Sequence, residues 1–172
     1  ISYALIFSCI IVSNRNSLGV ISQVITMIIK NKDVLATTEL RKQALDIIEV
    51  GIARVLPPNI MKSAVGYDAA NRVLNINGGT YHLSTGRVFV IGGGKASGLM
   101  AETLENIIHP ENISAGVVNC KSRYYKTSKI KIIPAGHPLP DRRGIEGVKK
   151  ILALRERYSI NENDLVICLI SG

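Results

Sequence analysis

Apolar residues recur every three or four positions between Thr38 and Val55, with charged residues between them. This period places the apolar side chains on one face of a helix, so the segment predicts an amphipathic α-helix. Thr37 or Thr38 can cap its N-terminus, and the pair Pro57-Pro58 is expected to end it.

A turn signal follows this helix. Asn77-Gly78-Gly79 separates two extended runs, residues 72–76 and 80–83. Asn-Gly between extended runs is a strong hairpin signal because both residues tolerate positive φ. The segment therefore predicts a small antiparallel hairpin.

Beyond Gly86, apolar runs of strand length alternate with helical patterns. The pattern predicts helices at residues 96–108 and 141–158, and strands at residues 87–91, 115–119, 130–134 and 165–170. Apolar strands separated by helices indicate a mostly parallel sheet with helices on both faces. The predicted fold class is α/β, with a Rossmann-like sheet whose ligands gather where the strands end.

The start of the chain is harder to interpret. Residues 1–12 form an apolar run without a preceding basic segment, shorter than the roughly 20 residues of a membrane-spanning helix. A core helix and a truncated signal or anchor both fit it. We treat residues 1–35 as an unassigned N-terminal segment and residues 36–172 as the first part of an α/β domain. Because the last apolar run leads directly into Ser171-Gly172, we expect this domain to be incomplete.

Composition narrows the class of protein. The chain has 172 residues, 47% of them hydrophobic, and a mean hydropathy of +0.22, which suffices for a packed core. Its three cysteines have neither an even count nor the spacing of zinc ligands. We therefore expect neither a disulfide scaffold nor a zinc module, and a cytoplasmic location is the default.

The positive charge is concentrated in one stretch. The net charge is +8, and residues 121–143 contain seven basic residues against one acid, Asp141. A solvated surface, a nucleic-acid surface and a funnel for an anionic substrate all fit this excess. Only Tyr124 and Tyr125 supply aromatic rings there, which disfavours nucleic acid.

A glycine-rich loop, Gly92-Gly93-Gly94-Lys95-Ala96-Ser97, joins a predicted strand to a predicted helix. Glycines let the backbone approach a ligand, and the helix start offers free N–H groups, so the loop can hold an anion. Lys95 adds a full charge where a phosphoryl group or carboxylate needs neutralising. The alternative is a tight turn with an exposed lysine. Phe89 and Ser97 stand where a Walker A loop and a dinucleotide fingerprint need glycine.

A second loop, residues 135–141, contains two prolines that stiffen it. His137 can bind an oxyanion or act as an acid or base. Asp141 can bind Mg²⁺ or a substrate hydroxyl, and it can also cap the following helix. These two roles are compatible.

Three segments, residues 87–101, 135–141 and 164–172, resemble in this order the N-terminal part of the class II glycerate kinases. The resemblance covers about residues 38–172. Such enzymes phosphorylate D-glycerate, typically at the 2-hydroxyl, with ATP and a divalent metal such as Mg²⁺. The family's catalytic arginine and C-terminal domain would lie beyond Gly172, so the resemblance implies that this chain is inactive alone.

The resemblance also implies roles for residues of this chain. Lys95 matches the active-site lysine and is the predicted catalytic residue. Substrate contacts are expected at Gly93, Gly94, Lys95, Ser97, His137 and Asp141. Ser171 and Gly172 would begin a nucleotide-contacting turn, and the metal ligands remain unassigned.

Two other functions remain open. One is an NAD(P)-dependent oxidoreductase similar to hydroxypyruvate reductase, although position 120, where its acidic ribose partner is expected, holds Cys120. The other is a non-catalytic module that binds anions or nucleic acid. For the kinase we expect D-glycerate as partner, neither nucleic acid nor membrane, and a homodimer as one open arrangement.

Overall fold

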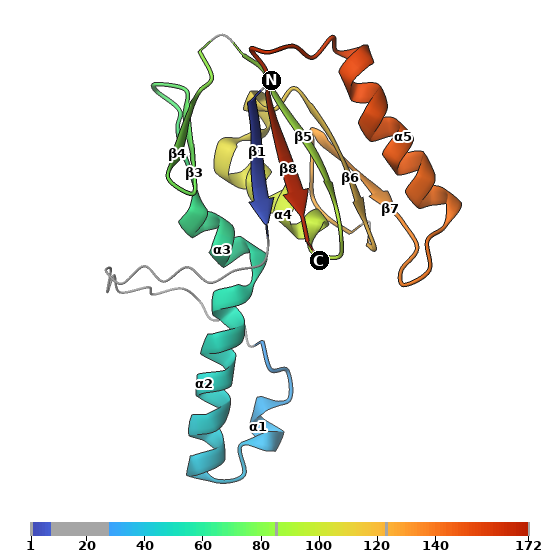
Figure 1. The fold of residues 1–172 in the computed structure, drawn as a ribbon. Helices are drawn as coiled ribbons and strands as arrows, with labels where there is room; N and C mark the ends of the chain where they lie inside the picture. The colour runs from blue at the N-terminus through green and yellow to red at the C-terminus, as the bar shows by residue number, and fades with distance from the viewer. Residues whose placement is uncertain (1, 8–27, 85, 123, 172) are drawn as a thin grey trace.

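The computed structural model describes residues 2–7, 28–84, 86–122 and 124–171. Its centre is a five-stranded sheet in the order β1-β8-β5-β6-β7, and every neighbouring pair is parallel (Figure 1). The strands are β1 (Ser2–Phe7), β5 (Val88–Gly93), β6 (Ala115–Cys120), β7 (Ile130–Pro134) and β8 (Leu165–Ile170). The predicted mostly parallel α/β sheet is confirmed.

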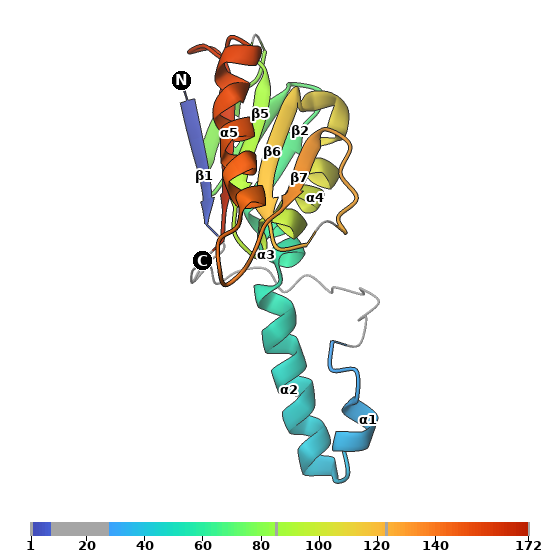
Figure 2. The ribbon, with the colours of Figure 1, turned by 90° about the vertical axis from the view of Figure 1, so that its right-hand side faces the viewer.

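Helices cover both faces of this sheet. α4 (Ser97–Ile108) and α5 (Arg142–Arg157) lie on opposite sides, as Figure 2 shows. Alternate strand residues point to the two faces, so Val90 and Ile167 join the core under α4, while Phe89 and Val166 join the core under α5. Apolar burial on both faces explains why the strands read as continuous apolar runs.

A second, antiparallel sheet contains β2 (Val65–Asp68), β3 (Val73–Ile76) and β4 (Gly79–His82). β3 and β4 form the predicted hairpin, and its turn residues Asn77 and Gly78 have φ values of 48° and 82°. The sequence prediction missed β2, because four residues that include a glycine give too short a pattern to recognise.

The predicted N-terminal helix is α2 (Glu39–Val55), and the Thr38 side chain caps it by accepting a 3.3 Å hydrogen bond from the Arg41 N–H. Pro57 ends α2 and begins α3 (Pro57–Ala64). Proline is favourable at the first position of a helix because the N–H that it lacks would have no partner within the helix there. Two further short elements are α1 (Lys32–Leu35) and the 3₁₀ turn η1 (Pro110–Asn112).

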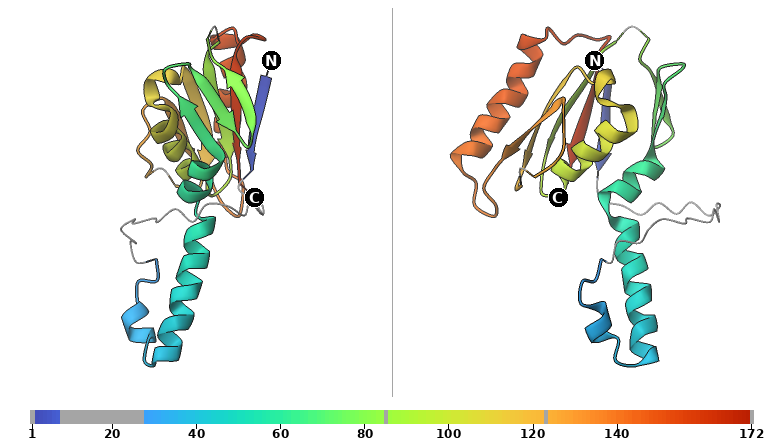
Figure 3. Two further views of the ribbon diagram at one scale, coloured as in Figure 1. Left: turned by 90° about the vertical axis from the view of Figure 1, so that its left-hand side faces the viewer. Right: turned by 180° about the vertical axis from the view of Figure 1, so that it is seen from behind.

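α2 extends away from the sheet, beside α1 (Figure 3). The two are tied together at Glu49, whose buried carboxylate accepts the N–H groups of Ile28 and Ile29 and pairs with the Lys32 ammonium. The apolar positions that predicted the helix are largely exposed, among them Leu40 and Ile47. The amphipathic pattern therefore identified the helix but not a buried face.

β1 gives part of the unassigned N-terminal segment a place in the fold. It pairs with β8 from Ser2 opposite Leu165 to Phe7 opposite Ile170, so the boundary drawn at residue 35 does not separate it from the sheet. An apolar run of this length fits a helix and a strand equally well. Residues 8–27 lie outside the described part of the chain. Among the helices that the structure describes, none combines the length and hydrophobicity needed to cross a membrane.

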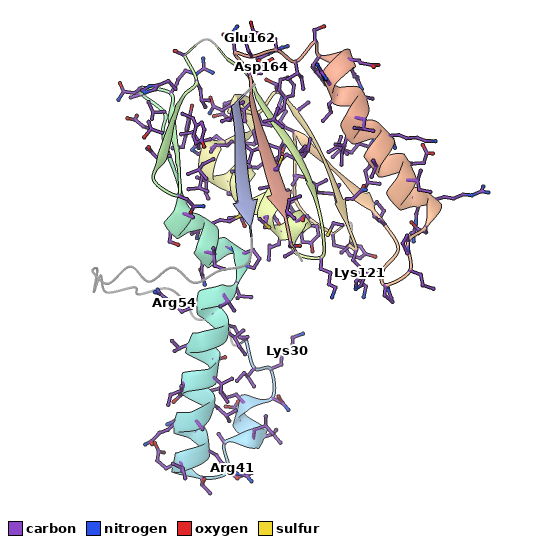
Figure 4. The ribbon with its side chains drawn as sticks, viewed as in Figure 1. Lys30, Arg41, Arg54, Lys121, Glu162 and Asp164 are labelled. Atoms are coloured by element: carbon purple, nitrogen blue, oxygen red, sulfur yellow. The ribbon has the colours of Figure 1, made fainter. Side chains whose placement is uncertain are left out.

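The amino ends of β5 and β8 are joined through a buried carboxylate. Asp164 accepts hydrogen bonds from the Arg87 side chain and backbone and from the Asn161 N–H, at 2.7 to 3.1 Å. The Arg87 guanidinium, together with these N–H groups, lowers the pKa of Asp164 to about 2. Figure 4 labels Asp164 at the end of the sheet opposite Lys121. This carboxylate is therefore structural and distant from the glycine-rich loop.

Replacing Asp164 with Asn is expected to lower the free energy of unfolding by about 2 to 3 kcal/mol, because buried N–H groups lose a charged acceptor. The folded-state pKa is depressed, so the stabilisation is complete well above the unfolded value of about 3.9 and is lost as pH falls through about 2. Guanidinium unfolding at several pH values tests this. Glu162→Gln, at an exposed neighbour, is the control, and an equal loss in both variants would contradict the assignment.

Candidate functional site

The carboxyl ends of β5, β6, β7 and β8 meet at one edge of the sheet, the lower edge in Figure 1. The glycine-rich loop leaves β5 there, Lys121 follows β6, residues 135–141 follow β7, and Ser171 follows β8. Parallel strands thus bring together segments separated by up to 80 residues, as the fold class predicts for a ligand site.

The glycine-rich loop is held between its two neighbouring strands. Gly94 has φ +122°, and a Cβ on it would lie 2.0 Å from the Ser171 carbonyl oxygen. Its N–H donates to the Asn119 carbonyl at 3.2 Å. At Gly93, by contrast, an added Cβ would meet nothing within 4 Å. Glycine is therefore required at position 94 by its positive φ and by close contact with Ser171, while position 93 borders open space.

Ser171 organises the start of α4. Its Oγ accepts the Ala96 N–H at 2.9 Å, and its own N–H donates to the Gly93 carbonyl at 3.1 Å. Since a hydroxyl also donates, Ser171 retains one donor for a ligand. Gly172, the other predicted nucleotide contact, lies outside the described residues.

Ser97 is the first residue of α4 and is completely buried. Its hydroxyl donates to the Leu169 carbonyl at 3.0 Å, which ties α4 to β8. Its side chain is thus bonded to β8 and lines neither cavity of Lys95, and a substrate contact by Ser97 stays a prediction.

Lys95 is exposed and lies between two adjoining cavities. The larger, of about 580 Å³, is also lined by Lys121, Tyr125 and Arg143. The smaller, of about 110 Å³, is also lined by Gly94, Lys121 and His137. Among the residues that the structure describes, no carboxylate forms an ion pair with Lys95. Its ammonium is therefore available to a ligand in either cavity.

The segment after β6 is fixed at two places. The Tyr125 ring packs on α4, where a Cβ on Gly98 would lie 2.2 Å from it. Burial, with a smaller effect of Cys120 and Glu102, raises the pKa of Tyr125, so the phenol stays protonated at neutral pH. Further along, the buried Glu105 carboxylate accepts the N–H groups of three successive residues at 2.7 to 2.8 Å; these are Ser128, Lys129 and Ile130. Tyr125 and residues 128–130 are thus both attached to α4.

Asp141 is the N-cap of α5. Its Oδ1 accepts the Gly144 N–H at 3.1 Å, and its Oδ2 lies 2.6 Å from the Arg143 guanidinium. The N–H groups of Gly136 and Gly144, with Arg143, lower the pKa of Asp141 to about 2. Asp141 borders a separate hollow beside α5 and does not line either cavity of Lys95. The structure thus shows the capping role, and a direct substrate contact by Asp141 stays a prediction.

Of the predicted site residues, the structure brings Gly94, Lys95 and His137 together around the smaller cavity. The sequence prediction did not select Lys121, Tyr125 and Arg143 as site residues, although all three line the larger cavity. The concentration of basic residues between positions 121 and 143 was the available signal. It did not show which of seven cations face the site.

No metal site is evident at this edge. In the described ranges, no three His, Cys, Asp or Glu side chains come close enough together to hold a metal ion. Asp141, for which Mg²⁺ binding is one of several roles open from the sequence, is occupied by the helix cap and by Arg143. These residues do not fit a metal ion held by this chain's own side chains.

Comparison with known families gives a match over most of the chain. Residues 43–172 match the family described as Domain of unknown function (DUF4147). The chain belongs to the DUF4147 family. This DUF4147 chain is 37% identical over 137 residues to a glycerate 2-kinase of Pyrococcus horikoshii, covering 75% of this chain and 29% of that protein. It is 40% identical over 88 residues to an Agrobacterium vitis protein provisionally named hydroxypyruvate reductase, covering 51% of this chain and 22% of that protein.

Solved structures agree with this assignment. The DUF4147 chain matches the PH0495 protein of Pyrococcus horikoshii with a TM-score of 0.63 and 31% identity, covering 76% of this chain and 28% of the other. It matches a glycerate kinase of Thermotoga maritima with a TM-score of 0.55 and 27% identity, covering 75% and 27%. The resemblance to the N-terminal part of the glycerate kinases is confirmed. The chain spans less than a third of the length of these relatives.

Proposed function

We propose that the full-length protein containing this chain transfers the γ-phosphoryl group of ATP to the 2-hydroxyl of D-glycerate. The observation that carries the proposal is Lys95, an exposed ammonium without a carboxylate partner in the described residues, placed between two cavities at the carboxyl edge of a parallel sheet. Relatives named glycerate 2-kinase and glycerate kinase support it.

Phosphoryl transfer needs mainly positioning and charge neutralisation. The glycerate hydroxyl oxygen forms a bond to the γ-phosphorus, the bond from that phosphorus to the bridging oxygen breaks, and ADP leaves. Lys95 neutralises charge on the transferring group, and Ser171 donates its remaining hydroxyl hydrogen to the nucleotide. His137 lines the same small cavity as Lys95 and can accept the proton released by the substrate hydroxyl.

Mg²⁺, which such chemistry uses, is proposed to enter with the phosphates of the nucleotide. Magnesium is commonly held by one or two carboxylates together with substrate phosphates, so it needs no complete set of protein ligands. No side chain of this chain is assigned to Mg²⁺, because the described residues contain no group of three His, Cys, Asp or Glu side chains that could hold a metal ion.

The test is ADP release by the full-length protein with ATP and D-glycerate, with the product identified by phosphorus NMR. We expect ADP only when D-glycerate is present, and 2-phosphoglycerate as the product. ATP hydrolysis that does not depend on D-glycerate would contradict the proposal.

A hydroxypyruvate reductase is the second candidate, favoured by the Agrobacterium vitis relative. Cys120 occupies the position where a dinucleotide-binding loop needs an acidic ribose partner, and its thiol instead donates to the Lys95 carbonyl at 3.3 Å. Loss of NADH absorbance with hydroxypyruvate would favour this candidate over the kinase.

A further inference from the structure

Three cations from three different elements line the larger cavity. Lys95 comes from the loop between β5 and α4, Lys121 directly follows β6, and Arg143 lies in the first turn of α5. The proposed phosphoryl transfer uses Lys95 and leaves Lys121 and Arg143 without a role. Figure 4 labels Lys121 at the carboxyl edge of the sheet, where the site lies.

Arg143 is held in place by Asp141. The Arg143 Nε and Nη2 atoms both lie 2.6 Å from Asp141 Oδ2, and the side chains are 64% and 31% exposed. An ion pair this exposed adds little to stability. The ion pair instead sets the direction of the Arg143 guanidinium, because Asp141 is itself fixed as the cap of α5. Asp141 therefore acts as a positioning residue for Arg143.

Lys121 follows a residue that is bonded to the loop of Lys95. Cys120, the last residue of β6, donates to the Lys95 carbonyl, and the chain beyond Lys121 is attached to α4 through Tyr125 and Glu105. Lys121 lines both cavities, so it borders the same space as Lys95. The residue that precedes Lys121 is thus bonded to the loop that carries Lys95.

The strand order separates the two sides of Lys95. Ser171, the proposed nucleotide contact, follows β8 on one side of β5. On the other side, Lys121 follows β6, His137 follows β7, and Arg143 lies in α5, which packs on these two strands. Asp141 occupies the Nε and Nη2 edge of the Arg143 guanidinium, which leaves the end formed by Nη1 and the second Nη2 hydrogen to donate. That end and the Lys121 ammonium together suit a carboxylate.

We propose that Lys121 and Arg143 bind the carboxylate of the hydroxy-acid acceptor and make the site selective for acids over neutral polyols. This assignment rests on the proposed function for the identity of the acceptor. The proposal concerns Lys121 and Arg143, which line the cavity, and not the other basic residues between positions 121 and 143.

The experiment compares Lys121→Met and Arg143→Met in the full-length protein with Lys126→Met and Arg142→Met, which remove exposed cations outside the lining of this cavity. Losing one charged hydrogen bond to the carboxylate is expected to raise the KM for D-glycerate about 10-fold to 100-fold in the first pair. The KM for ATP is expected to change less than about threefold. Lys121→Arg is expected to retain most of the affinity.

Direct calorimetric binding of D-glycerate separates this assignment from the proposed kinase activity. If the wild-type protein binds D-glycerate without ATP turnover and both Met variants weaken binding, the kinase proposal fails and the carboxylate site stands. If turnover is normal but the KM for D-glycerate changes equally in all four Met variants, or the KM for ATP rises instead, the carboxylate assignment is overturned.

Discussion

Replacing Lys95 with Met in the full-length protein is expected to lower kcat with D-glycerate at least about a hundredfold, the scale of losing one group that stabilises transition-state charge. Stability is expected to stay close to that of the wild type. Lys95 is exposed, and none of the ion pairs in the described ranges includes it. A Met side chain can occupy the same exposed position without leaving a buried group unpaired.

Steady-state kinetics and a thermal unfolding curve measure the two effects separately. Lys126→Met is the matched control, because Lys126 is an exposed lysine of the basic stretch outside both cavity linings. Near-normal turnover in Lys95→Met would contradict the catalytic role. A large drop in the unfolding midpoint would mean that the lysine has a structural role instead.

Local signals were sufficient to predict the elements around Lys95. The apolar run of β5, the three glycines and the helical period of α4 follow one another within about 20 residues, and each has its own physical cause. The strand nevertheless extends through Gly92 and Gly93, which were predicted as loop. Gly92 is needed in the strand because an added Cβ would lie 2.4 Å from the Leu169 carbonyl of β8. Such interstrand contacts cannot be inferred from the local pattern.

Side-chain direction was harder to predict than position. Ser97 and Lys95 are two residues apart. The Ser97 hydroxyl is nevertheless buried against β8, whereas Lys95 lines two cavities. Arg142 and Arg143 are neighbours, but only Arg143 lines the larger cavity, because Asp141 holds it there. These differences depend on the register of the sheet and on the cap of α5, which form only when distant segments meet.

Gly94→Ala is expected to have the second large effect, on both folding and activity. Gly94 has φ +122°, and the new methyl group would overlap the Ser171 backbone at 2.0 Å. Backbone strain and overpacking together are expected to lower the free energy of unfolding by about 2 to 4 kcal/mol. Relief of the overlap must move the loop relative to β8 and displace Lys95. A shift of about 1 Å in a positioning group can cost about a hundredfold in rate.

Gly93→Ala is a control within the same loop, since a Cβ at that position meets nothing within 4 Å. Its unfolding free energy is expected to change by less than about 1 kcal/mol. Chemical denaturation and kcat with D-glycerate, measured on both variants, test the comparison. If Gly93→Ala proved as damaging as Gly94→Ala, the close contact between the loop and Ser171 would not be the cause. Loss of activity in Gly93→Ala with unchanged stability would instead indicate that a ligand occupies the open space beside Gly93.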